Sequence, residues 1–134
     1  MISGIGTDLL KMSEIPSASL AKGDPFYEKI FTGEEKRQAD ASKDRDNWLR
    51  RRFAAKEAVF KALGENPDTA RISEIEVLDD DLGAPHVTLH GSLLEHARER
   101  GTKDILISLS SDGDYALAFA AAQTGASPMK GKDE

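Results

Sequence analysis

A long amphipathic helix, predicted for residues 46–63, constrains the fold of this chain more than any other segment. In and just before RRFAAKEAVFKALG (residues 51–64), Leu49, Phe53, Phe60 and Leu63 recur at spacings of four, seven and three, which places them on one helix face. Gly64 then supplies a typical helix stop. Other elements must cover this apolar face, so we expect the core of the protein to form along it.

The segments around this helix predict a single α+β domain. Strands are expected at residues 2–10, 71–80, 86–91, 104–110 and 114–122, and shorter helices at 13–20, after the capping box of Thr32 and Glu35, and at 92–101. The turn SDGD before the last strand favours a hairpin. We therefore predict one domain over residues 1–122, with a mainly antiparallel sheet packed on the long helix, and a disordered tail over 123–134.

The composition excludes several classes of protein. The 134 residues suit one domain, the net charge of −6 argues against nucleic-acid binding, and no apolar run is long enough to span a membrane. The start MISGIGTDLLK lacks the basic and apolar stretches of a signal peptide, so a cytoplasmic location is expected. The absence of cysteine rules out disulfides, thiolate catalysis and cysteine-ligated metals.

A carboxylate interrupts the apolar face of the long helix. Glu57 falls on the same face as the apolar residues. An unpaired buried carboxylate is costly in free energy, so Glu57 should be paired, protonated or bound to a metal. A neighbouring cation such as Lys56, Lys61 or Arg52 could satisfy it, and Glu57 alone does not decide between these possibilities.

A second acid lies on a strand face that is cleared by glycines. Gly4, Gly6 and Asp8 share one face of the first predicted strand, and glycine in a strand often marks close approach by a ligand or another backbone. Two carboxylates brought together repel unless a cation lies between them, and oxygen ligands suit Mg²⁺. Lys61, four residues after Glu57, could hold a phosphate. These three side chains predict chemistry on a pyrophosphate or phosphoester.

Two further features favour binding of a ligand or partner. The segment KDRDNWLRRR (residues 43–52) carries five cations against two acids, so it is either a solvated helix face or a docking site for an anionic ligand or partner. Ser110 lies in an apolar strand without a neighbouring histidine, which suits a hydrogen-bonding group in a pocket better than a nucleophile.

The sequence resembles the holo-acyl-carrier-protein synthase family of phosphopantetheinyl transferases. The resemblance covers nearly the whole chain, from GIGTD through FTGEEK, RRFAAKEAVFKALG, IEVLDDDLGAPHVTLHG and ISLSSDGDYALA. Its most specific part is an N-terminal G-x-D followed, at this separation, by F-x-x-K-E-A-x-x-K-A-x-G.

The resemblance implies transfer of the 4′-phosphopantetheine arm of coenzyme A to a serine of apo-acyl carrier protein, with adenosine 3′,5′-bisphosphate as the other product. The serine must lose a proton as it attacks the β-phosphate, either to Glu57 directly or through a metal-positioned water. The resemblance also implies a homotrimer with sites between the subunits.

The family's site residues match positions of this chain. The resemblance implies that Asp8 and Glu57 ligate Mg²⁺ against the coenzyme A pyrophosphate and that Lys61 lies at the phosphates. We therefore expect Asp8, Glu57 and Lys61 to be catalytic. With Ser110 added as a pocket group, the expected coenzyme-binding residues are Arg52, Lys56, Lys61, Gly64, Pro85 and Ser110.

Three positions depart from the family pattern. Ser111 stands where histidine is common at the coenzyme pocket, Ala84 stands where the turn commonly has lysine, and ENPDT (residues 65–69) stands where a glycine-rich run is common. Each change removes a phosphate contact or a close backbone approach. The alternatives are a non-catalytic relative that binds a carrier protein or nucleotide, and another Mg²⁺-dependent enzyme that acts on a pyrophosphate ligand.

Overall fold

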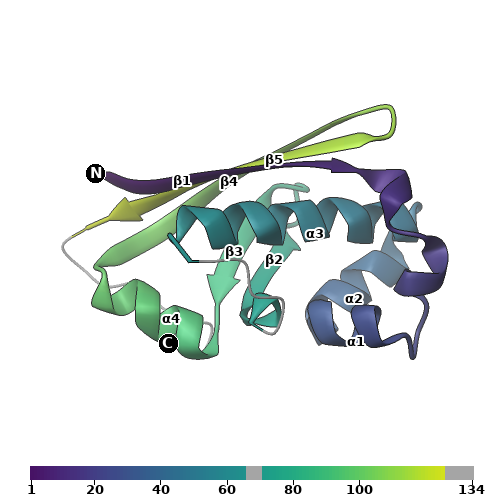
Figure 1. The fold of residues 1–134 in the computed structure, drawn as a ribbon, viewed down its shortest axis with the longest axis horizontal. Helices are drawn as coiled ribbons and strands as arrows, with labels where there is room; N and C mark the ends of the chain where they lie inside the picture. Colours follow the sequence, from purple (N-terminus) through teal and green to yellow (C-terminus); the bar gives the residue numbers. More distant parts are fainter. Residues whose placement is uncertain (66–70, 126–134) are drawn as a thin grey trace.

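The computed structural model describes residues 1–65 and 71–125, and it confirms an α+β fold built on one long helix (Figure 1). That helix, α3 (Arg45–Ala62), lies between a three-stranded sheet and a second layer. The second layer contains the hairpin of β2 (Ile75–Asp79) and β3 (Pro85–Leu89), the helices α1 (Pro25–Ile30), α2 (Gly33–Ala41) and α4 (Gly91–Glu99), and the short 3-10 segment η3 (Ile72–Glu74). Two more 3-10 segments, η1 (Met12–Glu14) and η2 (Ser17–Leu20), connect the sheet to α1.

The three-stranded sheet is antiparallel, with the order β1 (Ile2–Lys11), β5 (Tyr115–Thr124), β4 (Thr102–Asp112). Even-numbered alanines of β5 are buried against α3, whereas Leu117 and Phe119 face away and stay exposed. The β4–β5 turn contains Gly113 at a φ of 58°, a left-handed conformation that suits the predicted hairpin. Because β5 continues to Thr124, the sheet extends two residues past the predicted boundary at 122, and the tail from 126 lies outside the described residues.

The first strand approaches the long helix unusually closely. A Cβ placed on Gly4 would overlap the carbonyl oxygen of Ala62, and one placed on Gly6 would overlap that of Ala58. The predicted glycine face of β1 therefore accommodates another backbone, and small residues on both elements allow the contact. This packing fixes which residues of β1 meet which turn of α3.

Helix α1 was not expected from the sequence pattern. Asp24 accepts a hydrogen bond from the backbone nitrogen of Phe26 at 2.9 Å, and Pro25 occupies the first helical position. An Asp-Pro pair of this kind is a helix-start signal, and it identifies α1 in hindsight. The predicted capping box of α2 is confirmed, because Thr32 and Glu35 exchange side-chain and backbone hydrogen bonds. No helix in the described part of the chain is both long and apolar enough to cross a bilayer.

A buried ion pair joins α3 to three elements of the second layer, α1, α2 and β2. The Lys56 ammonium on α3 donates to Glu35 Oε1 on α2 and to the carbonyl oxygen of Ile30, each at 2.6 Å. The other Glu35 oxygen accepts from the backbone nitrogen of Val77 on β2 at 2.8 Å. Both charged side chains are fully buried, so each depends on the other for its charge to be compensated.

Replacing Lys56 with methionine should therefore be strongly destabilising. The variant leaves the Glu35 carboxylate buried without its cation, which typically costs about 3 to 5 kcal/mol of unfolding free energy. Urea denaturation followed by the fluorescence of the single tryptophan measures the loss. Lys36→Met is the matched control, since it breaks a solvent-accessible pair with Glu28 and should cost at most about 1 kcal/mol. Equal stability of the two variants would contradict the assigned role of Lys56.

Candidate active site

Asp8, Glu57 and Lys61 lie together where β1 crosses α3. The Lys61 ammonium donates to the carbonyl oxygen of Thr7 at 2.9 Å and to Asp8 Oδ1 at 3.4 Å. Glu57 is one helical turn before Lys61, and the charge of Asp8 acts directly on Glu57. The glycines that bring β1 against α3 thus bring the two acids and the lysine into one half-buried cluster.

Both carboxyl groups are harder to ionise than usual. Partial burial raises the pKa of Asp8, and the nearby Lys61 ammonium offsets part of that rise. Burial raises the pKa of Glu57, repulsion from Asp8 raises it further, and Lys61 opposes both effects. The cluster therefore holds more negative charge than one lysine compensates, which favours an added cation.

Glu57 makes no hydrogen bond or ion pair with any described residue. Each of the cations that could have satisfied it is held by another acid: Lys56 by Glu35, Arg52 by Asp79 and Lys61 by Asp8. The carboxylate is consequently available to bind a ligand.

The donor set fits a hard divalent cation that completes its coordination with other oxygens. Within residues 1–65 and 71–125, no cluster of three or more His, Cys, Asp or Glu side chains could hold a metal alone. Two neighbouring carboxylates suit Mg²⁺, which usually keeps several waters and binds substrate phosphates. Asp8 and Glu57 are the residues that would hold it.

Two of the expected coenzyme-binding residues lie away from a common pocket. Lys56 is fully buried and paired with Glu35, so it stabilises the core and is not free to contact a coenzyme. Gly64 is exposed just after α3, where a φ of 72° ends the helix. Residues 66–69 of the ENPDT departure lie outside the described residues.

Lys61 belongs to the acid cluster, and the other three expected residues line a cavity of about 460 Å³ between α3, the β2–β3 turn and β4. Arg52 contributes from α3, Pro85 from the hairpin and Ser110 from β4. Apolar atoms and hydroxyl groups share its walls, which are formed by Trp48, Arg51, Arg52, Asp79, Gly83, Pro85 and residues 107–111. A cavity of this size can hold a nucleotide-sized group.

The acid cluster and the cavity do not meet within one protomer. Arg52 precedes Glu57 by five residues, which places the two side chains about 140° apart around the axis of α3. Asp8 is on β1 and Ser110 is on β4, and these strands are the opposite edges of the three-stranded sheet. The acid cluster and the cavity therefore face different directions.

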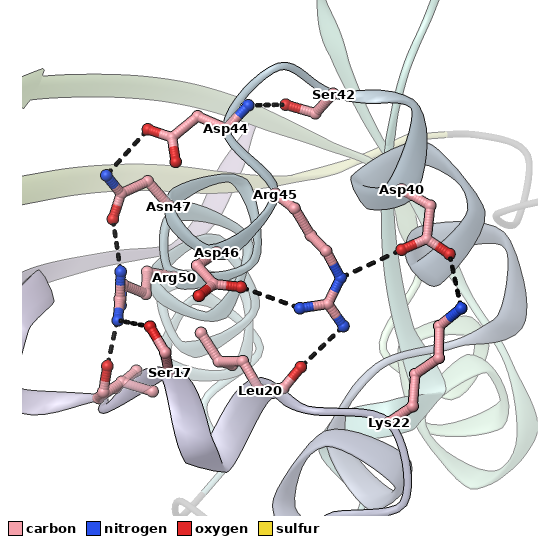
Figure 2. A network of polar contacts seen from close by, with 11 residues as sticks. Ser17, Leu20, Lys22, Asp40, Ser42, Asp44, Arg45, Asp46, Asn47 and Arg50 are labelled. Carbon is pink, nitrogen blue, oxygen red and sulfur yellow. Dashed lines mark hydrogen bonds and ion pairs between the residues drawn. The ribbon is translucent and has the colours of Figure 1, made fainter.

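The predicted basic segment, residues 43–52, offers fewer cations for binding an anionic ligand or partner than its composition indicates. Figure 2 shows that Arg45 donates to Asp40, Asp46 and the carbonyl oxygen of Leu20, at 2.7 to 3.1 Å. The Arg50 guanidinium donates to the carbonyl oxygen of Ile15 at 2.9 Å and to Asn47 and Ser17. These arginines fasten α3 to the segment before it, so a docking role for residues 43–52 rests on the other cations.

Asp79 is a cavity residue that the sequence did not single out. One of its carboxylate oxygens accepts from Arg52 Nη2 at 2.9 Å and from the Trp48 indole nitrogen at 3.2 Å. Trp48 is buried, and the Arg52 guanidinium lies 4.1 Å from the centre of its ring. The run DDD marks a turn, and nothing in that pattern indicates which acid reaches back to α3.

The comparisons with known proteins agree with this architecture. The family description "4'-phosphopantetheinyl transferase superfamily" matches residues 4–120. The chain therefore belongs to the 4′-phosphopantetheinyl transferase superfamily, and within it to the holo-[acyl-carrier-protein] synthases. It is accordingly a transferase of phosphopantetheine, and the non-catalytic alternative is not supported.

Individual relatives span most of the chain. A holo-[acyl-carrier-protein] synthase of Desulforudis audaxviator is 41% identical over 122 residues, covering 91% of this chain and 93% of its own. The crystal structure of the Neisseria meningitidis synthase has a TM-score of 0.81 at 33% identity, covering 92% of this chain and all of its own. The structure of a Chronobacterium ammoniagenes ACPS–CoA complex has a TM-score of 0.78 at 31% identity, covering 91% of this chain and 97% of its own.

The raised pKa of Glu57 predicts how Glu57→Gln changes stability with pH. Because the folded state holds the Glu57 proton more tightly than the unfolded state, the group's stabilising contribution is present below its ordinary value of 4.5 and is lost as pH rises through the folded pKa. With a chelator present, the unfolding free energy of Glu57→Gln should therefore rise relative to that of the wild type as the pH increases from 4 to 7. Urea titrations across this range measure the difference.

Glu95→Gln removes an exposed carboxylate elsewhere and serves as the charge-matched control. Its difference from the wild type should stay nearly constant over the same pH range. A Glu57→Gln curve parallel to that of the wild type would show that Glu57 is not strained in the folded state.

Proposed function

We propose that this protein transfers 4′-phosphopantetheine from coenzyme A to a serine of apo-acyl carrier protein in a Mg²⁺-dependent reaction. Asp8 and Glu57 hold the metal, and Lys61 binds the phosphates. The observation that carries the proposal is the meeting of these three side chains, with Glu57 lacking any partner among the described residues. The synthase–CoA complex of Chronobacterium ammoniagenes supports coenzyme A as the donor.

The reaction forms a bond between the serine oxygen and the β-phosphorus and breaks the bond to adenosine 3′,5′-bisphosphate. The Lys61 ammonium, which is partly exposed, balances negative charge that develops on the phosphoryl oxygens and the leaving group. The serine proton passes to the Glu57 carboxylate directly or through one water. Bound Mg²⁺ would supply Lewis-acid polarisation of the phosphoryl oxygens.

We further propose a homotrimer in which the acid cluster of one subunit lies against the cavity of the next. Two observations support it. The acid cluster and the cavity face different directions in one chain. The outer face of the three-stranded sheet is apolar and exposed, with Leu9 at 66% and Phe119 at 43%, and such a patch favours an interface. We assign the protein to the cytoplasm, since a chain without cysteine needs no oxidising compartment.

Intact-mass spectrometry tests the transfer. Apo-acyl carrier protein incubated with coenzyme A, Mg²⁺ and this protein should gain one phosphopantetheine, and EDTA should stop the gain. Glu57→Gln should fold and lower the rate by at least about a hundredfold, a typical effect of losing a proton-transfer group. Glu95→Gln should keep the wild-type rate. Transfer that persists in EDTA would contradict the metal site, and no transfer to any of several carriers would contradict the proposed function.

Mixing two defective variants tests the shared site. Glu57→Gln damages the acid cluster, and Ser111→Tyr fills the cavity from its wall. Each should be inactive alone, and subunits mixed by co-refolding should recover about a quarter of the wild-type activity, the share of sites that combine two intact halves at random. Glu57→Gln mixed with Asp8→Asn should recover nothing, because both changes damage the same half. No recovery in verified mixed oligomers would place the complete site within one chain.

A further inference from the structure

The geometry of the acid cluster is fixed by contacts within one chain. β1 is hydrogen-bonded to β5, and Gly4 and Gly6 pack it directly against the backbone of α3. The Lys61 ammonium joins the same two elements by donating to the carbonyl oxygen of Thr7 at 2.9 Å. Since these contacts involve neither a coenzyme nor a carrier protein, the acid cluster keeps its arrangement whether or not either substrate is bound.

Solvent reaches the acid cluster. The side chains of Lys61 and Asp8 are 44% and 19% exposed, and Glu57 is partly exposed. In the proposed transfer, a serine hydroxyl carried by another protein must approach Glu57 from solution. A water molecule is smaller than the serine hydroxymethyl group, so an approach that admits the serine also admits water.

Glu57 offers the same contact to water as to serine. Its carboxylate has no hydrogen bond or ion pair with any described residue, so it can accept a hydrogen bond from either O–H group. Enzymes that prevent attack by water close a lid or assemble the site only when the proper acceptor binds. A cluster fixed by a strand ladder and by backbone packing does not depend on such a step. Preference for the serine must therefore come from docking of the carrier protein, which holds one hydroxyl at the site.

We propose that this protein also hydrolyses coenzyme A, with water in place of the carrier serine. This inference rests on the proposed function, because it uses the same donor and the same acid cluster. The water oxygen forms a bond to the β-phosphorus, and the bond from that phosphorus to the bridging oxygen of the diphosphate breaks. One water proton passes to Glu57, and the Lys61 ammonium balances the charge on the leaving group. The products are 4′-phosphopantetheine and adenosine 3′,5′-bisphosphate.

Hydrolysis is slow beside transfer. A well-placed reacting group has an effective concentration of about 10⁵ to 10⁸ M, far above that of bulk water. We therefore expect hydrolysis to be at least about a thousandfold slower than transfer. It should become slower still as added apo-carrier protein occupies the approach to the acid cluster.

Coenzyme A incubated with the protein and Mg²⁺ in H₂¹⁸O, with no carrier protein, tests the hydrolysis. Mass spectrometry should find one ¹⁸O in 4′-phosphopantetheine and none in adenosine 3′,5′-bisphosphate, because water attacks the β-phosphorus. Glu57→Gln should lower the rate by at least about a hundredfold, whereas Glu95→Gln, which changes an exposed acid on α4, should keep it. Label in the bisphosphate, or equal rates in the wild type and Glu57→Gln, would overturn the proposal.

The transfer assay on the same preparation separates this inference from the proposed function. Transfer to a carrier without any labelled 4′-phosphopantetheine would overturn the hydrolysis and leave the proposed function intact, whereas the absence of both products would contradict both. With coenzyme A in excess, the initial rate of labelling should fall as apo-carrier protein is added. A rate that the carrier does not change would show that water reaches the phosphorus at a different site, and it would also overturn the proposal.

Discussion

The close contact between β1 and α3 is the constraint on which the site depends. Gly4 and Gly6 leave no side chain between the strand and the carbonyl oxygens of the helix, so the two backbones pack directly. Asp8 follows on the same face of the strand and reaches Lys61, and its charge acts on Glu57. Side chains in place of the glycines would move the strand outward and separate the acids, whatever the identity of the catalytic residues.

Two adjacent charged residues of α3, Lys56 and Glu57, have opposite environments. Lys56 has a complete set of partners inside the protein, and it contributes to stability through Glu35 and the backbone of α1 and β2. One position later, Glu57 has no partner among the described residues and a raised pKa. The first arrangement stabilises the fold, and the second keeps a carboxylate ready for a ligand at the expense of stability.

Sequence patterns predicted the parts of the molecule that local rules govern. The helical period located Glu57 on an apolar face, and the alternation of β1 located Asp8 beside the glycines. Lys56 and Glu57 are adjacent, yet composition and spacing could not say which of them lies in the core. Lys56 can be buried because Glu35 on α2 pairs with it, and this contact exists only in the folded structure. The same holds for Arg45, Arg50 and Asp79, whose partners lie up to 35 residues away in the chain.

The hairpin of β2 and β3 lies beside β4 without joining its sheet, and within the described residues no strand ladder connects them. The cavity occupies this seam, with Gly83 and Pro85 on one side and residues 107–111 on the other. Side chains hold the hairpin instead, since the backbone nitrogen of Val77 donates to Glu35 and Asp79 accepts from Arg52. The width of the cavity therefore depends on side-chain contacts, whereas the acid cluster is positioned by the direct packing of a laddered strand against a helix.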